Sequence, residues 1–412
     1  MPRWRILLPV NVATQRHAFS TRCALCALCW LFALGCANFV TPPDAGLPPA
    51  PPPTRPAQCA TQAVPGHWTR VTDASAPSPR TFAASVRVGA RLLVWGGLGP
   101  RGEERTDGAL YDPRSDAWEP VPAGAPGGDR RRLTVAALGE RVFVWELLSR
   151  RGAIFDVRTR TWTPVPDAGA PRFVQRAVGM TDAWFVWSLG GTGEHNSASV
   201  LSPDAARWRE LLPPLRQDAR NSSAITWTGT QVLVWGGTEA SFSTQPPRND
   251  GYRYSPSDDQ WSSVENAGAP SPRWGAELFW TGLEALVWGG NNGSRQLWDG
   301  GLYDPVDDRW RALPSASAVL ATPTSTIEAS SAWTGCTLFV WAGALPDSGA
   351  RAAVFDRYAS QWMAAAQFPG TAAIEGVVVG AAGESVLVWG GARGTGASRV
   401  TTGEGWRWTA TP

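Results

Sequence analysis

The chain has 412 residues, of which 37 are basic and 35 acidic, so its formal net charge at pH 7 is only +2. Every basic residue is Arg, and the absence of Lys excludes Schiff-base catalysis and a phosphate-loop Lys. Nearly balanced charge gives no electrostatic footprint for a nucleic acid. With three His and no cluster of His, Cys or carboxylate residues at ligand spacing, we predict neither a metal nor another cofactor.

The N-terminal residues 1–35 are predicted to be a signal peptide. They contain four Arg and no acidic residue, and the apolar run 24–35 has only 12 residues, too few to cross a bilayer core about 30 Å thick. A basic region followed by a short apolar core and small residues is typical of a secretory signal. Cys23, Cys26 and Cys29 are spaced like metal ligands but lie on this apolar core, so no metal site is predicted there.

Residues 33–36, Ala-Leu-Gly-Cys, resemble a bacterial lipobox, in which the Cys is lipidated and becomes the mature N-terminus. Leu is usual at the position that Ala33 holds. The resemblance implies lipidation at Cys36 and an exported protein of the outer membrane or cell envelope that contacts the membrane only through its lipid. Ordinary cleavage, which would give a periplasmic or secreted protein, and an uncleaved anchor remain as alternatives.

Residues 36–64 follow as a linker. The stretch 41–58 is Pro-rich, has no periodicity and favours extended polyproline II geometry, which spans about 3.1 Å per residue. Such a segment would hold the next domain some tens of ångströms from a membrane. The alternative is a leader with no spacing role.

From about residue 65 the chain repeats. The tetrapeptide Val-Trp-Gly-Gly and its variants recur seven times, and a second Trp follows each copy. Steps between successive copies are 42 to 53 residues, as expected of stacked supersecondary units. The first series is Trp95, Trp145, Trp187, Trp235, Trp288, Trp341 and Trp389, and the second is Trp118, Trp162, Trp208, Trp261, Trp310, Trp362 and Trp408.

The first unit shows the elements of the repeat most clearly. The runs 81–86 and 92–95 are β-branched or aromatic and are bounded by turn residues, so we predict two strands. Gly96 and Gly97 end the second strand where the chain must turn with positive φ or let another backbone approach. Tyr111-Asp112-Pro113 is turn chemistry, and Trp118 follows six residues after the Asp. Each unit is thus predicted to be four antiparallel strands.

Four-stranded sheets of this length have two apolar faces that one sheet cannot bury alone. Packed side by side around an axis they form a β-propeller, which leaves only short, protected edges. We therefore predict an all-β fold, a seven-bladed β-propeller of four-stranded antiparallel blades spanning residues 65–412. The Trp rings are expected between neighbouring sheets, where each can bury roughly 150 to 250 Å².

The order Pro-x-Pro-Arg, apolar strand, Gly-Gly, aromatic-Asp-Pro and Trp resembles the kelch repeat, and the resemblance covers about residues 65–412. Kelch repeats form β-propellers, so the resemblance implies the same fold. The second, third, sixth and seventh units depart from the pattern; the second, for example, has Glu146-Leu147 where Gly-Gly is expected. The first, fourth and fifth units carry it most completely, at Tyr111-Asp112-Pro113, Tyr254-Ser255-Pro256 and Tyr303-Asp304-Pro305.

One element is left over. Trp68 looks like the tail of a further unit, because the sequence around it matches the sequence around Trp261. A strand from one terminus often completes the last blade of a propeller and removes an exposed edge. Trp408, however, is expected to supply the outer strand of blade seven. Which of the two strands pairs and which is peripheral stays open.

The loops between the second and third strands of the units are the predicted binding surface, because they vary as binding loops would. They cover residues 101–107, 190–196, 238–250 and 291–300. Trp298 lies outside both Trp series, and an aromatic ring flanked by Arg295 and Asp299 is a reasonable contact hot spot. The alternative is that these loops simply tolerate drift. The predicted binding residues are Arg101, Arg105, Arg248, Arg295 and Trp298.

Four further Arg precede the first strands of their units at matching points. We expect them to bond neighbouring carbonyls or a turn Asp rather than a ligand. They are Arg80, Arg172, Arg220 and Arg273.

Cys59 and Cys336 are the two Cys beyond the lipobox. Export would place both in an oxidising compartment, where disulfides persist. Cys59 precedes the first unit, and Cys336 lies in the predicted turn between the first two strands of blade six. A bond between them would attach the leader to the ring if closure brings their Cα atoms within about 7 Å.

We therefore expect a surface-anchored, monomeric propeller that acts as a protein- or carbohydrate-binding module rather than as an enzyme. The alternative is an extracytoplasmic sugar-processing enzyme on a kelch propeller, of the sialate-epimerase or oxidase type. A galactose-oxidase site needs two His and two Tyr, but Tyr111, Tyr254 and Tyr303 are repeat positions, so only the scaffold resembles that enzyme. Convergent ionisable residues near the axis would favour an enzyme. A third possibility is purely structural display.

Overall fold

The computed structural model describes residues 59, 63–147, 149–189, 196–205, 207–212, 220–238, 246–320, 330–345, 349–370, 375–394 and 398–411. The chain divides into two units, residues 1–51 and 52–412, and every described residue belongs to the second. The predicted signal peptide, Cys36 and nearly all of the linker therefore lie outside the described residues. Among the described helices, none is long and apolar enough to cross a membrane.

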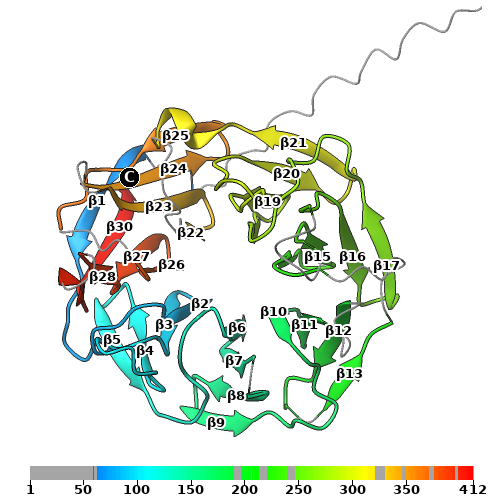
Figure 1. Ribbon diagram of the computed structural model, residues 1–412, viewed down its shortest axis with the longest axis horizontal. Helices are drawn as coiled ribbons and strands as arrows, with labels where there is room; N and C mark the ends of the chain where they lie inside the picture. The colour runs from blue at the N-terminus through cyan, green and yellow to red at the C-terminus, as the bar shows by residue number, and fades with distance from the viewer. Residues whose placement is uncertain are drawn as a thin grey trace, which may run out of the picture. The chain divides into compact units, whose positions relative to one another are not determined.

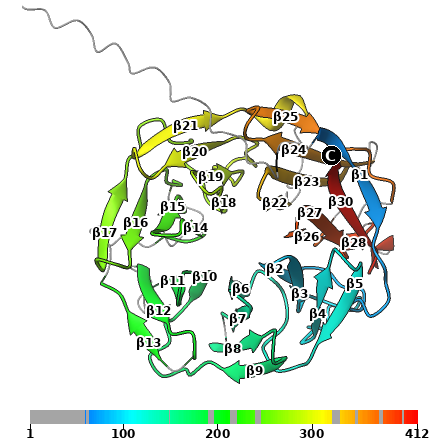
Figure 2. The ribbon, with the colours of Figure 1, turned by 180° about the vertical axis from the view of Figure 1, so that it is seen from behind.

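Seven four-stranded antiparallel sheets surround a central axis, as Figures 1 and 2 show from the two sides. This confirms the predicted seven-bladed β-propeller. Blade one consists of β2 (Ala84–Val88), β3 (Arg91–Trp95), β4 (Gly108–Asp112) and β5 (Ala117–Val121). Blade two consists of β6 (Leu133–Leu138), β7 (Arg141–Glu146), β8 (Arg151–Asp156) and β9 (Thr161–Pro164). Blade three consists of β10 (Val174–Gly179), β11 (Trp184–Leu189), β12 (Asn196–Leu201) and β13 (Trp208–Glu210).

Blades four to six continue in chain order, and each again uses four consecutive strands. Blade four consists of β14 (Ala224–Trp227), β15 (Val232–Trp235), β16 (Gly251–Ser255) and β17 (Gln260–Val264). Blade five consists of β18 (Glu277–Trp280), β19 (Ala285–Trp288), β20 (Gly300–Asp304) and β21 (Arg309–Leu313). Blade six consists of β22 (Ser330–Trp333), β23 (Thr337–Leu345), β24 (Gly349–Asp356) and β25 (Gln361–Ala364). A short 3-10 helix, η2 (Ala316–Ala318), follows blade five.

The second strand of a blade is its most buried element. In β15, β19 and β27 every residue is buried, because sheets pack against both faces of the strand. This explains why these strands are continuous apolar runs such as Leu-Val-Trp rather than alternating patterns. The core is accordingly divided into clusters that lie between neighbouring blades.

The first strand of blade one begins three residues later than predicted. Phe82 has a φ of 54°, so the chain turns in the left-handed region before β2 can start at Ala84. Thr81 makes only an isolated bridge with Leu98. The prediction for Gly97 is confirmed: its φ is 93°, and a Cβ there would lie 2.7 Å from the carbonyl oxygen of Thr81.

Blade seven is built from both ends of the chain. From the axis outward it consists of β26 (Val378–Ala382), β27 (Ser385–Trp389), β30 (Gly405–Thr411) and β1 (Ala63–Arg70). A small ribbon of β28 (Ala392–Arg393) and β29 (Val400–Thr401) lies in its loop, and β1 lies beside β30 in Figures 1 and 2. The N-terminal strand therefore completes the last blade.

The expectation that Trp408 lies on the outer strand of blade seven is wrong. Trp408 is fully buried on the third strand, where it pairs with Val386. Tyr111 holds the same position in blade one, where it pairs with Leu92. The outer Trp of blade seven is Trp68, so the second Trp series begins with Trp68 and does not include Trp408.

The seven outer Trp make one repeated contact around the ring. The indole Nε1 of each donates to the backbone carbonyl four residues after the outer Trp of the preceding blade. Trp118 donates to Thr72 at 3.0 Å, and Trp68 closes the ring by donating to Ala366 at 2.8 Å. The other pairs are Trp162 with Pro122, Trp208 with Pro166, Trp261 with Leu212, Trp310 with Glu265 and Trp362 with Pro314.

The Trp of the first series are buried between sheets, as predicted, and none exposes more than 2% of its surface. Each packs against the outer Trp of the next blade. Ring centroids are 4.9 Å apart for Trp95 and Trp162, and 4.5 Å apart for Trp288 and Trp362. The two Trp series together form the inter-blade core.

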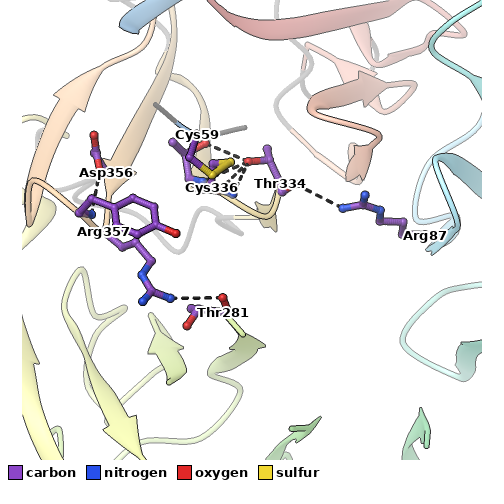
Figure 3. Close-up of a disulfide and its surroundings, with 9 residues drawn as sticks. Cys59, Arg87, Thr281, Thr334, Cys336, Asp356 and Arg357 are labelled. Atoms are coloured by element: carbon purple, nitrogen blue, oxygen red, sulfur yellow. Dashed lines mark hydrogen bonds between the residues drawn. A yellow bond between two sulfur atoms is a disulfide. The ribbon is translucent and has the colours of Figure 1, made fainter. Parts of the chain in front are cut away.

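A disulfide joins Cys59 to Cys336, whose Cα atoms lie 5.5 Å apart (Figure 3). Cys336 is in the hairpin between β22 and β23, and Thr334 of that hairpin accepts a hydrogen bond from Arg87 of blade one at 3.4 Å. Leu283, the matching residue in blade five, is 56% exposed, whereas Cys336 is 5% exposed. Cys59 is thus attached to a hairpin of blade six, at a position that is exposed in blade five.

Candidate functional site

Antiparallel strands place alternate connections on opposite faces of the ring. The loops between the second and third strands emerge together with the links between blades on one face, which we call the loop face. The hairpins between the first and second strands and between the third and fourth strands emerge on the other, the hairpin face. The predicted binding residues Arg101, Arg105, Arg248 and Arg295 all belong to the loop face, so the fold brings them to one side of the ring.

Three buried Arg hold the bases of these loops. Arg80 donates to the carbonyls of Gly96 and Asp107, at 2.9 and 3.0 Å, so it fixes both ends of one loop. Arg273 makes the corresponding bonds to Gly289 and Asp299, both at 3.0 Å. Arg220 donates to the carbonyl of Asp250 at 3.0 Å and to its carboxylate at 2.7 Å. These Arg are structural, as expected.

Two of the Asp residues at these bases, Asp250 and Asp107, have a pKa below its ordinary value because of their Arg partners. Partial burial alone would raise the pKa of Asp250, but the hydrogen bond and charge of Arg220 outweigh it, so the pKa lies below its ordinary value. The pKa of Asp107 is lowered in the same way by Arg80. Arg172 does not follow this pattern, because it is exposed rather than buried.

Arg101 and Arg105 lie in the loop between β3 and β4 but differ in exposure. Arg101 is exposed at the tip, where its backbone N–H donates to Glu103 at 2.9 Å. Arg105 is half-buried, and its guanidinium donates to Glu103 at 2.8 Å. Its backbone N–H and carbonyl also bond Gly97 and Gly128. Arg101 is therefore the more available of the two for a partner.

Arg248 and Arg295 show a similar contrast. Arg248 is half-buried, and its backbone carbonyl accepts from the N–H of Arg273 at 3.0 Å. Arg295 is exposed at the end of a tight turn in which Asn292 Oδ1 accepts from its backbone N–H at 3.0 Å. Arg101 and Arg295 are thus the exposed loop-tip cations among the predicted binding residues.

Trp298 is part of the core rather than a surface contact. It is 6% exposed and belongs to the cluster around Trp288, Leu302 and Leu313 between blades five and six. Its carbonyl accepts from the N–H of Ala316 at 2.9 Å, which holds η2 against the loop. The expectation of an exposed aromatic hot spot at this position is corrected, because the chain turns inward before β20 and buries the ring.

Three ionisable side chains that the sequence did not suggest lie near the central axis, where the first strands of the blades begin. Glu277 and Arg176 occupy the same register position in blades five and three, opposite Trp288 and Trp187. Both side chains are exposed. Arg130, in the link before β6, donates to the carbonyl of Val377 at 2.7 Å. We call Glu277, Arg176 and Arg130 the axial cluster.

The carboxyl group of Glu277 is unusual in its titration. Although the side chain is exposed, the blades around the axis displace part of its hydration, and this desolvation raises the pKa of Glu277 even though the charges of Arg176 and Arg130 act to lower it. At the same register position, blades four and one carry Ala224 and Ala84. Aligning the residue eleven places before the repeated Trp of each unit would have found Glu277 and Arg176 from the sequence, but not Arg130, which lies in a link between blades.

Among the described residues, no group of three or more His, Cys, Asp or Glu is placed to hold a metal ion. Residues 190–195 and 239–245 of the predicted binding loops lie outside the described residues, as does Cys36. The comparison with protein-family models and the comparison with curated proteins give no match for this chain.

Proposed function

We propose that the protein is an exported, surface-anchored propeller of the kelch type whose loop face binds a protein or carbohydrate partner. The observation that carries this proposal is the division of labour between strands and loops. The side chains of the second strands are used in packing between blades, whereas the loops are held at their bases by buried Arg and present Arg101 and Arg295 to solvent. A surface held in this way loses little conformational entropy when it binds.

The disulfide supports export, because such bonds persist in oxidising compartments and are rare in the cytosol. Anchoring rests on the lipobox resemblance at Cys36. Mass spectrometry of the mature N-terminus should find a diacylglyceryl Cys36, and Cys36→Ser should release the protein from the membrane fraction. An unmodified N-terminus at another residue would contradict the lipid anchor but not the binding role.

Binding is tested with the doubly substituted variant Arg101→Ala/Arg295→Ala as bait in an envelope extract. We expect it to lose the partner that the unchanged protein captures. The matched control is Arg114→Ala/Arg309→Ala, which removes two exposed Arg of the hairpin face and therefore has the same net charge as the loop-face variant. Equal loss in both variants would show that charge alone, and not the loop face, governs capture.

The axial cluster favours one second candidate, a sugar-processing enzyme. Glu277, whose pKa is raised, lies near Arg176 and Arg130 at the axis, and a perturbed carboxyl group beside basic side chains is typical of a reactive site. Turnover of a sugar by the purified protein, abolished by Glu277→Gln and retained in the loop-tip variant, would replace the binding module with the enzyme. Absence of turnover together with partner capture would favour the binding module.

A further inference from the structure

Blade three departs from the repeat where its first strand begins on the loop face. The segment from Arg172 through Phe173 to Arg176 leads into β10, the strand of blade three nearest the axis (Figures 1 and 2). The side chains of these three residues are exposed, and Phe173 exposes 46% of its surface. We call the three residues the blade-three patch.

Arg172 is free because another residue holds the base of its loop. In blade one Arg80 holds the loop base by donating to the carbonyl of Gly96. Ser188 has the matching position in blade three, and its carbonyl accepts instead from the side chain of Asn196 at 3.3 Å. Within the part of the chain that the structure describes, the guanidinium of Arg172 has no ion pair. It is therefore available to a partner.

Phe173 has a backbone conformation that is unfavourable for its residue type. Its φ is 50°, in the left-handed region where a residue with a Cβ is less stable than Gly. Its carbonyl accepts from the N–H of Leu189 at 3.2 Å, which holds the chain in this turn. The residues that enter the first strands of four other blades share this region, and two of them are Gly: Phe82, Ser222, Gly275 and Gly376. The chain thus keeps a strained Phe where the fold accepts Gly.

Packing explains the strained Phe of blade one but not that of blade three. Phe82 is 6% exposed, and the guanidinium of Arg131 lies over its ring at 4.5 Å. No described ring or cation lies over Phe173. A strained residue that contributes little to the core points to a contact role.

A β-bulge precedes the third residue of the patch. The pairing of β10 with β11 shifts register between Val174 and Arg176, so the strand starts with an extra residue. Bulges often re-aim a side chain beside a functional site. At the register position of Arg176, the only other charged residue in the described first strands is Glu277, whose carboxyl group offsets part of the charge of Arg176. Arg172 has no such counterpart, so the patch is net positive.

We propose that the blade-three patch binds a protein segment in which an apolar side chain lies next to carboxylates. The apolar side chain packs on Phe173, and the carboxylates accept charge-assisted hydrogen bonds from Arg172 and Arg176. Aromatic residues and Arg are both enriched in protein interfaces. A neutral carbohydrate would bring no carboxylate to the two Arg, and a basic segment would be repelled by them. This inference rests on the proposed loop-face binding and names the chemistry of the partner.

The first test places a photo-crosslinker in the patch. The full chain with Phe173→p-benzoylphenylalanine is illuminated in an envelope extract, and mass spectrometry identifies the crosslinked segment. We expect a protein segment rich in Asp and Glu. Adding Arg172→Gln/Arg176→Gln should lower the crosslinking yield about tenfold or more, because it removes the charge-assisted contacts.

Two controls match this test. Leu283→p-benzoylphenylalanine carries the crosslinker at a side chain that is 56% exposed on the hairpin face, and it should not give the same product. Arg114→Gln/Arg309→Gln, combined with the crosslinker at position 173, removes two exposed Arg of the hairpin face and should keep the yield. No product, a product without acidic residues or a carbohydrate product would overturn the inference.

The second test separates contact from packing. Phe173→Gly should bind the identified partner about tenfold or more weakly. Its unfolding midpoint should equal or exceed that of the wild type, because Gly relieves the left-handed strain. A midpoint that falls as it does for a lost core ring would show that Phe173 serves packing and would overturn the inference. If Phe173→Gly keeps partner capture while Arg101→Ala/Arg295→Ala loses it, loop-face binding stands and only the blade-three patch fails.

Discussion

Blades five and seven use the same repeat in opposite ways. Blade five is one continuous stretch from Glu277 to Leu313 and carries the complete motif, with Tyr303 donating to Asp308 at 2.6 Å. Blade seven joins strands from the two ends of the chain. Each blade contains two Trp outside the two series, Trp280 and Trp298 in blade five and Trp406 and Trp408 in blade seven. In blade five Trp298 is core, whereas in blade seven Trp406 is half-buried. A Trp outside the repeat can therefore be part of the core or stay partly exposed, depending on how the blade around it is built.

The largest effect is expected from Trp298, the buried loop Trp of blade five. Trp298→Ala should lower the free energy of unfolding by about 3–5 kcal/mol, because it removes a large buried ring and leaves a cavity. Denaturant titration checks this against Arg295→Ala, three residues away and exposed, which should stay within about 0.5 kcal/mol. If both variants were equally stable, Trp298 would not be a core residue.

The second prediction concerns the disulfide, whose removal should affect blade seven, the blade that closes the ring, and not blade five. Cys59→Ser or Cys336→Ser should cost about 2–5 kcal/mol, because the bond restricts the unfolded chain over a sequence separation of 277 residues. Hydrogen exchange should accelerate first in β1 and β30 of blade seven and leave β18 to β21 of blade five protected. Uniform acceleration around the ring would mean that the bond does not act through closure of blade seven.

A smaller, pH-dependent effect on the melting temperature should have opposite signs for a substitution at Glu404 in blade seven and one at Glu277 in blade five. Partial burial alone would raise the pKa of Glu404, but hydrogen bonds from Arg393 and Trp406 lower it on balance in the folded state. The stabilising contribution of Glu404 is thus complete above its ordinary pKa and is lost as the pH falls through the lowered value. Glu404→Gln should therefore lower the melting temperature at neutral pH, and this deficit should disappear in acid.

Glu277 behaves in the reverse way because its pKa is raised. Its ionised form is disfavoured in the folded state, so the wild-type protein loses stability as the pH rises from the ordinary pKa through the raised one. Glu277→Gln should thus match the wild type in acid and melt at a higher temperature at neutral pH. Melting curves of both variants between about pH 3 and pH 8 test the two signs together. Curves that shift in the same direction for both variants would contradict the contrast.

Sequence reasoning succeeded where a feature depends on neighbouring residues. The Val-Trp-Gly-Gly spacing predicted the number of blades, and Gly97 was predicted either to take positive φ or to let another backbone approach, because strand and turn chemistry are local. It failed where two distant segments compete for one position. Trp68 and Trp408 both look like outer-strand residues, and only the pairing of β1 with β30 shows which one is outermost. The same limit applied to Trp298, since a loop's sequence does not show whether the loop folds inward.

By itself the sequence determined the repeat, and therefore an all-β ring of seven blades, because a period of about fifty residues with regularly spaced Trp leaves few other ways to bury so many rings. Tertiary structure decided which terminal strand closes the ring and joined Cys59 to Cys336. It also gathered Glu277, Arg176 and Arg130 from three segments, and placed Trp406 beside Phe368. These relations depend on distances between blades rather than on spacing within a blade, and only the closed ring defines those distances.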